Sequence, residues 1–137
     1  MHDSVSSLIT IQEELKLKSV ESIKRFKIPE IIAVSKTFKM NNILPLINHG
    51  HLHFGENKVQ EAKEKWENIK SDFKNLKLHM IGKLQSNKVK QAVSLFDYIH
   101  SLDNFKLAKK ISEEQIKKNK KLKIFIQVNI GNEENKS

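Results

Sequence analysis

The chain contains no cysteine among its 137 residues. A disulfide scaffold, a thiol nucleophile and a cysteine-ligated metal cluster are therefore excluded. Glycine and proline are also scarce, at four and two residues, which excludes collagen-like and low-complexity chains. No apolar run of about 18 residues occurs, so the sequence predicts no transmembrane helix. The first residues do not have the pattern of a signal peptide, and we expect a protein of the cytoplasm.

Arginine is nearly absent, although the chain is strongly basic. Lysine and arginine together number 25 against 16 acidic residues, which gives a net charge of +9. Arg25 is the single arginine, whereas arginine is the residue best suited to bidentate recognition of phosphates and bases. The lysines are spread over the whole chain, which is typical of a solvated surface. We therefore expect no nucleic-acid partner, and a basic nucleic-acid-binding domain stays as an alternative.

Short apolar runs alternate with amphipathic segments along the chain. This alternation is typical of βα units and predicts an α/β fold with a parallel sheet. One additional helix precedes the first strand. Another short helix is expected to begin at Asn41 or Asn42, to hold Pro45 in its first turn and to stop at Gly50. The other expected helices are residues 6–26, 58–70, 87–96 and 104–119, and the expected strands are residues 31–35, 52–55, 76–81, 98–101 and 122–128.

Polar residues follow each expected strand, and parallel α/β folds bind ligands at the carboxyl ends of their strands. Lys36 follows the first strand directly. If apolar side chains enclose it, they favour the neutral amine, which acts as a base or forms a Schiff base with a carbonyl group. A lysine that extends into solvent is the plain alternative. The other residues at the expected strand ends are Glu56, Asn57, His79, His100, Ser101 and Asn129.

The histidines offer a weaker signal. His79 fits an acid, a base or a hydrogen-bonded core residue, and its place in an apolar run favours the core residue. His49, His51 and His53 alternate as metal ligands on a strand do. However, no cysteine or carboxylate accompanies them, so we predict no metal site.

Several sequence blocks together resemble one family, the pyridoxal-phosphate homeostasis proteins (the YggS/PROSC type). The resemblance covers roughly residues 8 to 137, and Leu78 departs from it, because an aromatic residue is usual there. The blocks are Ala33-Val34-Ser35-Lys36-Thr37, Phe54-Gly55-Glu56-Asn57-Lys58-Val59-Gln60-Glu61, His79-Met80-Ile81-Gly82-Lys83-Leu84-Gln85-Ser86-Asn87-Lys88, Phe96-Asp97-Tyr98-Ile99-His100-Ser101-Leu102-Asp103 and Gln127-Val128-Asn129-Ile130.

The resemblance implies a TIM-like (β/α) barrel of the alanine racemase N-terminal type that holds pyridoxal 5'-phosphate (PLP). Lys36 falls on the family's Schiff-base lysine, and Asn57 and His79 fall on motif residues near the cofactor. Members of the family carry and buffer PLP without a robust catalytic activity of their own. The resemblance therefore implies a PLP-binding protein that is not an enzyme, with residues 1–137 as one barrel domain.

The chain differs from the family in length. A full barrel has eight βα units and typically about 250 residues. Here we expect a barrel that is truncated after about five strands. The family's Ser-rich loop and Arg-Ile-Gly segment, which bind the phosphate, are not found in these 137 residues. The first and fifth strands become edges. Unless another chain covers them, they expose Ile31, Ile32, Val34, Ile124, Ile126 and Val128.

An enzymatic alternative is a fold-type III PLP enzyme of the amino-acid racemase type. Such an enzyme needs a second acid or base opposite the cofactor and a substrate-binding domain, for which 137 residues leave no room. The sequence does not indicate an oligomeric state.

Overall fold

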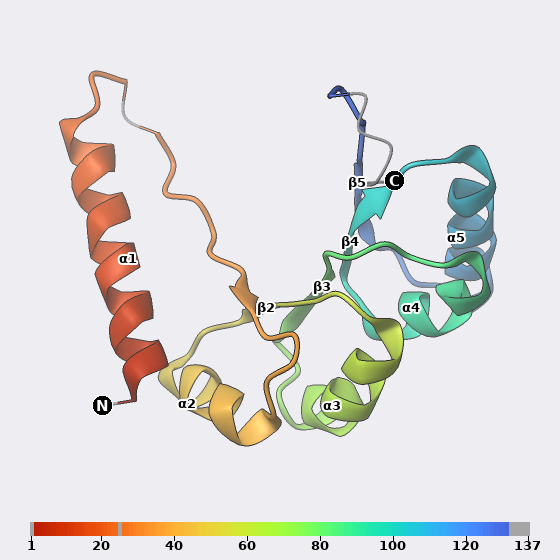
Figure 1. Ribbon diagram of the computed structural model, residues 1–137, viewed down its shortest axis with the longest axis horizontal. Helices are drawn as coiled ribbons and strands as arrows, with labels where there is room; N and C mark the ends of the chain where they lie inside the picture. Colours follow the sequence, from red (N-terminus) through yellow and green to blue (C-terminus); the bar gives the residue numbers. More distant parts are fainter. Residues whose placement is uncertain (1, 25, 132–137) are drawn as a thin grey trace. The chain divides into compact units, whose positions relative to one another are not determined.

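A computed structural model describes residues 2–24 and 26–131 of the chain (Figure 1). The end of the family resemblance, residues 132–137, lies outside these described residues. The backbone divides into two compact units. The first comprises residues 1–31 and 38–52, and the second comprises residues 32–37 and 53–137. The prediction of one domain over residues 1–137 stays a prediction.

The first unit contains helices α1 (Asp3–Glu21) and α2 (Met40–His49), which contact each other. Helix α1 confirms the predicted N-terminal helix, although only Val5 and Leu8 of its apolar residues are buried. The predicted start of α2 was wrong, because the helix begins after Lys39 and has no side-chain cap. Pro45 consequently lies beyond the first turn. Gly50 ends α2 in the left-handed conformation, as predicted.

The second unit contains a five-stranded parallel sheet in the order β1-β2-β3-β4-β5. Each neighbour in the sheet is thus also the next strand in the sequence. This arrangement confirms the predicted βα units and the α/β class of fold. The strands are β1 (Ala33–Val34), β2 (His53–Glu56), β3 (Lys77–Met80), β4 (Tyr98–Leu102) and β5 (Lys123–Ile126).

Three helices lie along one side of the sheet, namely α3 (Val59–Asp72), α4 (Val89–Leu95) and α5 (Phe105–Lys118) (Figure 1). A short 3-10 turn, η1 (Ser86–Lys88), precedes α4. Side chains of a strand alternate between the two faces of a sheet. One face carries the apolar side chains that form the core with these helices. They include Phe54, Leu78, Met80 and Ile99, which are all at most 1% exposed, and the Phe54 ring contacts the Trp66 ring at 5.0 Å.

The end of α5 is followed by a lysine that bonds to the protein. Asn119 ends the helix in the left-handed conformation. Lys120 Nζ then donates hydrogen bonds to the carbonyl oxygens of Ser94 (3.1 Å) and Phe96 (2.9 Å) at the end of α4. Lys120 therefore joins the end of α5 to the end of α4.

Strands β1 and β5 each pair with one strand among the described residues, and both expose apolar side chains. Val34 in β1 is 49% exposed, and Ile126 in β5 is 75% exposed. Ile31, Ile32 and Ile124 are covered in part. The expected apolar edges are thus confirmed for Val34, Ile126 and Val128. In the described portion, none of the helices is long and apolar enough to cross a membrane.

Candidate functional site

Lys36 and Asn57 lie just beyond the carboxyl ends of two adjacent strands. Val34, the last residue of β1, pairs with Gly55 of β2. Lys36 follows β1 by two residues, and Asn57 follows β2 directly. Lys36 is exposed, so within the described part of the chain its side chain extends into solvent, which was the plain alternative, and apolar groups do not enclose it. Its amine makes no hydrogen bond or ion pair with any described residue, and is free to react.

The backbone at Lys36 is held by helix α3. The backbone N–H of Thr37 donates to both carboxylate oxygens of Glu61, at 2.9 and 3.2 Å. Lys65 Nζ donates to the carbonyl oxygen of Ser35 at 2.7 Å. Thr37 has a φ of 67°, in the left-handed region that a β-branched residue rarely adopts. Such a conformation costs on the order of 1–3 kcal/mol, so the surrounding bonds must maintain it.

A buried ion pair connects this helix to the end of β2. Glu56 is fully buried, and its Oε1 lies 2.6 Å from Lys65 Nζ. The same oxygen accepts a hydrogen bond from Trp66 Nε1 at 3.0 Å. A buried carboxylate is tolerated only when it is paired and hydrogen-bonded. Lys65 thus bridges the ends of β1 and β2.

The loop after β3 approaches Asn57 closely. A Cβ atom added to Gly82 would lie 2.4 Å from the carbonyl oxygen of Asn57 and 2.8 Å from its Cα. Only glycine permits such a close approach of two backbones. Gly82 therefore brings the end of β3 against the residue that follows β2.

His79 lies in the middle of a row of three histidines on the sheet face opposite the helices. His53 Nδ1 and His79 Nε2 are 2.9 Å apart, and so are His79 Nδ1 and His100 Nε2. The His79 ring stacks on Tyr98 at 4.1 Å, and the His100 ring stacks on Phe125 at 4.7 Å. The buried and hydrogen-bonded side chain of His79 confirms the prediction of a core residue. A role for His79 with a cofactor stays a prediction.

Burial keeps the central histidine neutral. His79 is 3% exposed. Desolvation lowers its pKa to about 4, and the neighbouring His100 and His53 contribute to this lowering, against an opposing effect of Asp97. Desolvation also lowers the pKa of His100. In each His–His bond one nitrogen donates and the other accepts, so a neutral His79 accepts a hydrogen bond at one ring nitrogen and donates one from the other.

The described residues contain no group of three His, Asp or Glu side chains placed to hold a metal ion. The row of histidines is linked by hydrogen bonds between its rings. The candidate site therefore consists of Lys36, Asn57 and the groups that hold them.

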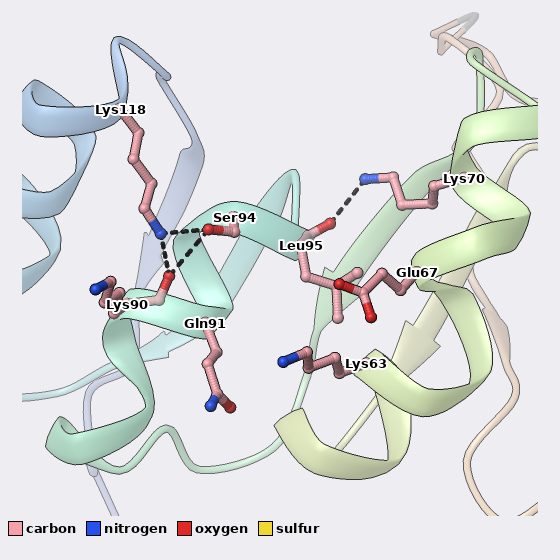
Figure 2. A pocket seen from close by; sticks show the side chains of 8 residues that line it. All are labelled: Lys63, Glu67, Lys70, Lys90, Gln91, Ser94, Leu95 and Lys118. Atoms are coloured by element: carbon pink, nitrogen blue, oxygen red, sulfur yellow. Dashed lines mark hydrogen bonds between the residues drawn. The ribbon is translucent and has the colours of Figure 1, made fainter.

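A cavity of about 480 Å³ lies between α3, α4 and the end of α5 (Figure 2). It is lined by four lysines, but two of them are tied to the protein. Lys70 bonds to the carbonyl oxygen of Leu95 and to Asp97, and Lys118 bonds to the carbonyl oxygen of Lys90 and to the Ser94 hydroxyl. None of the predicted site residues lines this cavity. We therefore place the site at the strand ends and not here.

Five parallel strands in sequence order, with helices on one face, define a β/α domain that corresponds to part of a barrel. The sequence profile of the family described as "Alanine racemase, N-terminal domain" matches residues 17–135. The chain belongs to this family.

The chain is also similar to individual proteins and solved structures. The Pyridoxal phosphate homeostasis protein of Haemophilus influenzae is 37% identical over 131 residues, which are 96% of this chain and 55% of that protein. The structure of PipY from Synechococcus elongatus with PLP bound is 36% identical, with a TM-score of 0.70, over 88% of this chain and 55% of PipY. A structure from Bifidobacterium adolescentis, described as an unknown protein, has a TM-score of 0.80 and 26% identity over 99% of this chain and 57% of that one.

These comparisons confirm the resemblance to the pyridoxal-phosphate homeostasis proteins and the alanine racemase N-terminal type of fold. The chain spans about half the length of the curated relatives it matches. PLP is bound by a longer protein, PipY. That this chain also binds PLP is a proposal.

Sequence reasoning missed the residues that hold Lys36. Glu61 and Lys65 lie one helical turn apart on the helix that follows β2. A carboxylate and an ammonium at positions i and i+4 share one face of a helix, and that spacing was the available signal. The sequence also did not show that His53 and His100 are neighbours of His79, because only the pairing of the strands brings these residues together.

Proposed function

We propose that this chain binds PLP through a Schiff base on Lys36 and takes part in PLP homeostasis as a carrier. One observation carries the proposal: Lys36 presents a free amine on a backbone segment that α3 holds at the end of β1. The likeness to PipY, whose structure contains PLP, supports the choice of cofactor.

The residues present fit the aldehyde end of PLP. Lys36 would hold PLP as a Schiff base on the aldehyde, with water as the leaving group. No oxidant or reductant is required. Asn57, which follows the neighbouring strand β2, would supply an amide that can donate and accept hydrogen bonds. PLP itself supplies electron withdrawal by its ring.

The proposal assigns no catalytic activity to the chain. The relatives are named for homeostasis and not for a reaction. A racemase would need an acid and a base on opposite faces of the cofactor, and His79 is already bonded to two histidines. Exchange of the α-proton of alanine for deuterium in the presence of PLP would favour the enzymatic alternative.

The nucleic-acid alternative predicts binding to duplex or single strands that weakens steeply with salt. Binding that is absent at low ionic strength removes it. The cytoplasmic location expected from the sequence stays a prediction.

The test is to add PLP to the chain, reduce with borohydride and map the modified lysines by peptide mass. We expect one adduct per chain on Lys36, and none at this position in Lys36→Ala. Lys39→Ala is the matched control, because Lys39 is also exposed, and it should label as the wild type does. Labelling scattered over many lysines, or an unchanged total in Lys36→Ala, would contradict the proposal.

A further inference from the structure

The two peptide groups that flank Lys36 are both bonded to the same helix. The Ser35 carbonyl belongs to the peptide group before Lys36, and it accepts from Lys65 at 2.7 Å. The Thr37 N–H belongs to the peptide group after Lys36, and it donates to Glu61 at 2.9 Å. Fixing both peptide planes fixes the direction in which the Lys36 side chain leaves the backbone. The side chain of Lys36 itself remains free.

Glu61 and Lys65 suit this arrangement by their spacing on α3. Residues four apart lie on one face of a helix, one turn above the other. Helix α3 therefore presents an acceptor and a donor to consecutive peptide groups of a single loop. Because Lys65 also pairs with the buried Glu56 at 2.6 Å, its ammonium is fixed from two sides.

The backbone conformation shows that the loop does not adopt this form by its own preference. Thr37 has a positive φ, which few residues other than glycine adopt. Strained backbone of this kind persists where the surroundings determine it. The two hydrogen bonds of the Thr37 N–H to Glu61 are the contacts that hold it.

We propose that Glu61 and Lys65 are positioning residues, which aim the Lys36 amine so that it reacts with PLP in preference to the other lysines of the chain. This inference rests on the proposed function of Lys36. It adds that selectivity for Lys36 comes from α3. The chain has many exposed lysines, so a free aldehyde needs a reason to choose one of them.

The experiment compares Glu61→Ala, Glu61→Gln and the control Glu67→Ala. Glu67 lies on the same helix, is exposed, and has no bond to the Lys36 loop. Each protein is treated with subsaturating PLP and borohydride, and the fraction of label on Lys36 is measured by peptide mass. We expect about a tenfold lower ratio of Lys36 label to other lysine label in Glu61→Ala. Glu67→Ala should match the wild type.

The conservative variant separates positioning from folding. Glu61→Gln keeps an oxygen that accepts from the Thr37 N–H, so it should restore most of the selectivity. Hydrogen exchange of the Thr37 amide, measured without PLP, should accelerate in Glu61→Ala and remain slow in Glu61→Gln. Equal selectivity in Glu61→Ala and wild type would overturn the inference.

A test of Lys65 requires a variant that does not leave a buried charge without its partner. Removing Lys65 alone leaves Glu56 buried without its cation, which is strongly destabilising. The double variant Glu56→Gln, Lys65→Met removes both charges and keeps an acceptor for Trp66. It should lose selectivity for Lys36 while its unfolding remains cooperative, and retained selectivity would overturn the role of Lys65.

Failure of the proposed function is distinguishable from failure of this inference. If the wild-type chain is not labelled on Lys36, the proposed function fails, and the role of the two residues toward PLP fails with it. If the wild type is labelled and Glu61→Ala is labelled equally, only the inference fails.

Discussion

Gly82 and Gly55 differ in the atoms that surround them. A Cβ on Gly82 would meet the backbone of Asn57 at 2.4 Å, whereas a Cβ on Gly55 would meet only side-chain atoms of Ile32 and Ile81, at 3.1 and 3.2 Å. Side chains adjust by small rotations, but backbone does so only by moving the whole loop. The site is therefore sensitive to Gly82 in particular.

We expect Gly82→Ala to lower the free energy of unfolding by about 2–3 kcal/mol, since the added methyl group overlaps backbone atoms. Gly55→Ala should cost less than about 1 kcal/mol, because flexible side chains give way. Urea denaturation of both variants checks the order. An equal cost for the two variants would contradict this explanation.

The neutral state of His79 predicts a dependence of stability on pH. The pKa of His79 is about 4 in the folded protein, whereas the ordinary pKa of a histidine, which the unfolded chain retains, is 6.5. Above pH 6.5 both states are neutral, and the contribution is complete. As the pH falls from 6.5 toward 4, the unfolded chain binds a proton that the folded chain does not, so stability falls. The loss is on the order of 2 kcal/mol between pH 7 and 4.5.

Urea denaturation between pH 7.5 and 4.5 measures this effect. In His79→Gln the part of the pH dependence that comes from His79 should disappear. His49→Gln is the control, because His49 is exposed, and it should retain the wild-type slope. If the free energy of unfolding varied with pH in the same way in His79→Gln and in the wild type, another group would be responsible for the pH dependence.

The sequence predicted the positions of Lys36 and Asn57 well, because the strand-end rule depends only on where an apolar run stops. It did not predict how they are held. Glu61 and Lys65 are separated from Lys36 by 25 or more residues, and only the packing of α3 against the sheet makes them neighbours. The sequence also left the exposure of Lys36 open, since an apolar run does not specify what covers its end.

The ends of helices were predicted to within a few residues where the sequence contains a residue that commonly ends a helix. Gly50 and Asn119 end their helices in left-handed conformations, as such residues commonly do. The start of α2 was predicted incorrectly because Asn41 resembles a cap, whereas the chain is already helical at Met40. Pro45 therefore lacks an N–H within the helix, and the interior of α2 misses one hydrogen bond.

Lys120 joins the end of α5 to the end of α4. We expect Lys120→Gln to lower the free energy of unfolding by about 1–2 kcal/mol, because two carbonyl oxygens lose a charged donor. Lys121→Gln is the matched control, since Lys121 is exposed and should change stability by less than about 0.5 kcal/mol. Thermal unfolding of both variants measures the difference. Equal stability would mean that Lys120 is effectively solvated.

The exposed edge of β5 gives a prediction for the whole molecule. Ile126 is 75% and Phe125 is 53% exposed beside an edge that pairs only with β4 among the described strands. Open edges with apolar side chains promote association of chains. We expect the mean mass in sedimentation to rise with concentration, and Ile126→Lys to reduce the rise several-fold. A concentration-independent mass for the wild type would contradict this prediction.

The sequential order of the strands has a consequence for how the sheet assembles. Paired residues of neighbouring strands are separated by only about 20 to 25 positions in the sequence, for example Ala33 with Phe54 and Tyr98 with Lys123. The entropy lost on closing a loop grows slowly with its length, so each strand joins the sheet at a similar cost. Contacts of short sequence separation favour rapid folding. The sheet can thus grow strand by strand from the N-terminal side as the ribosome releases the chain, with each new strand finding its template already formed.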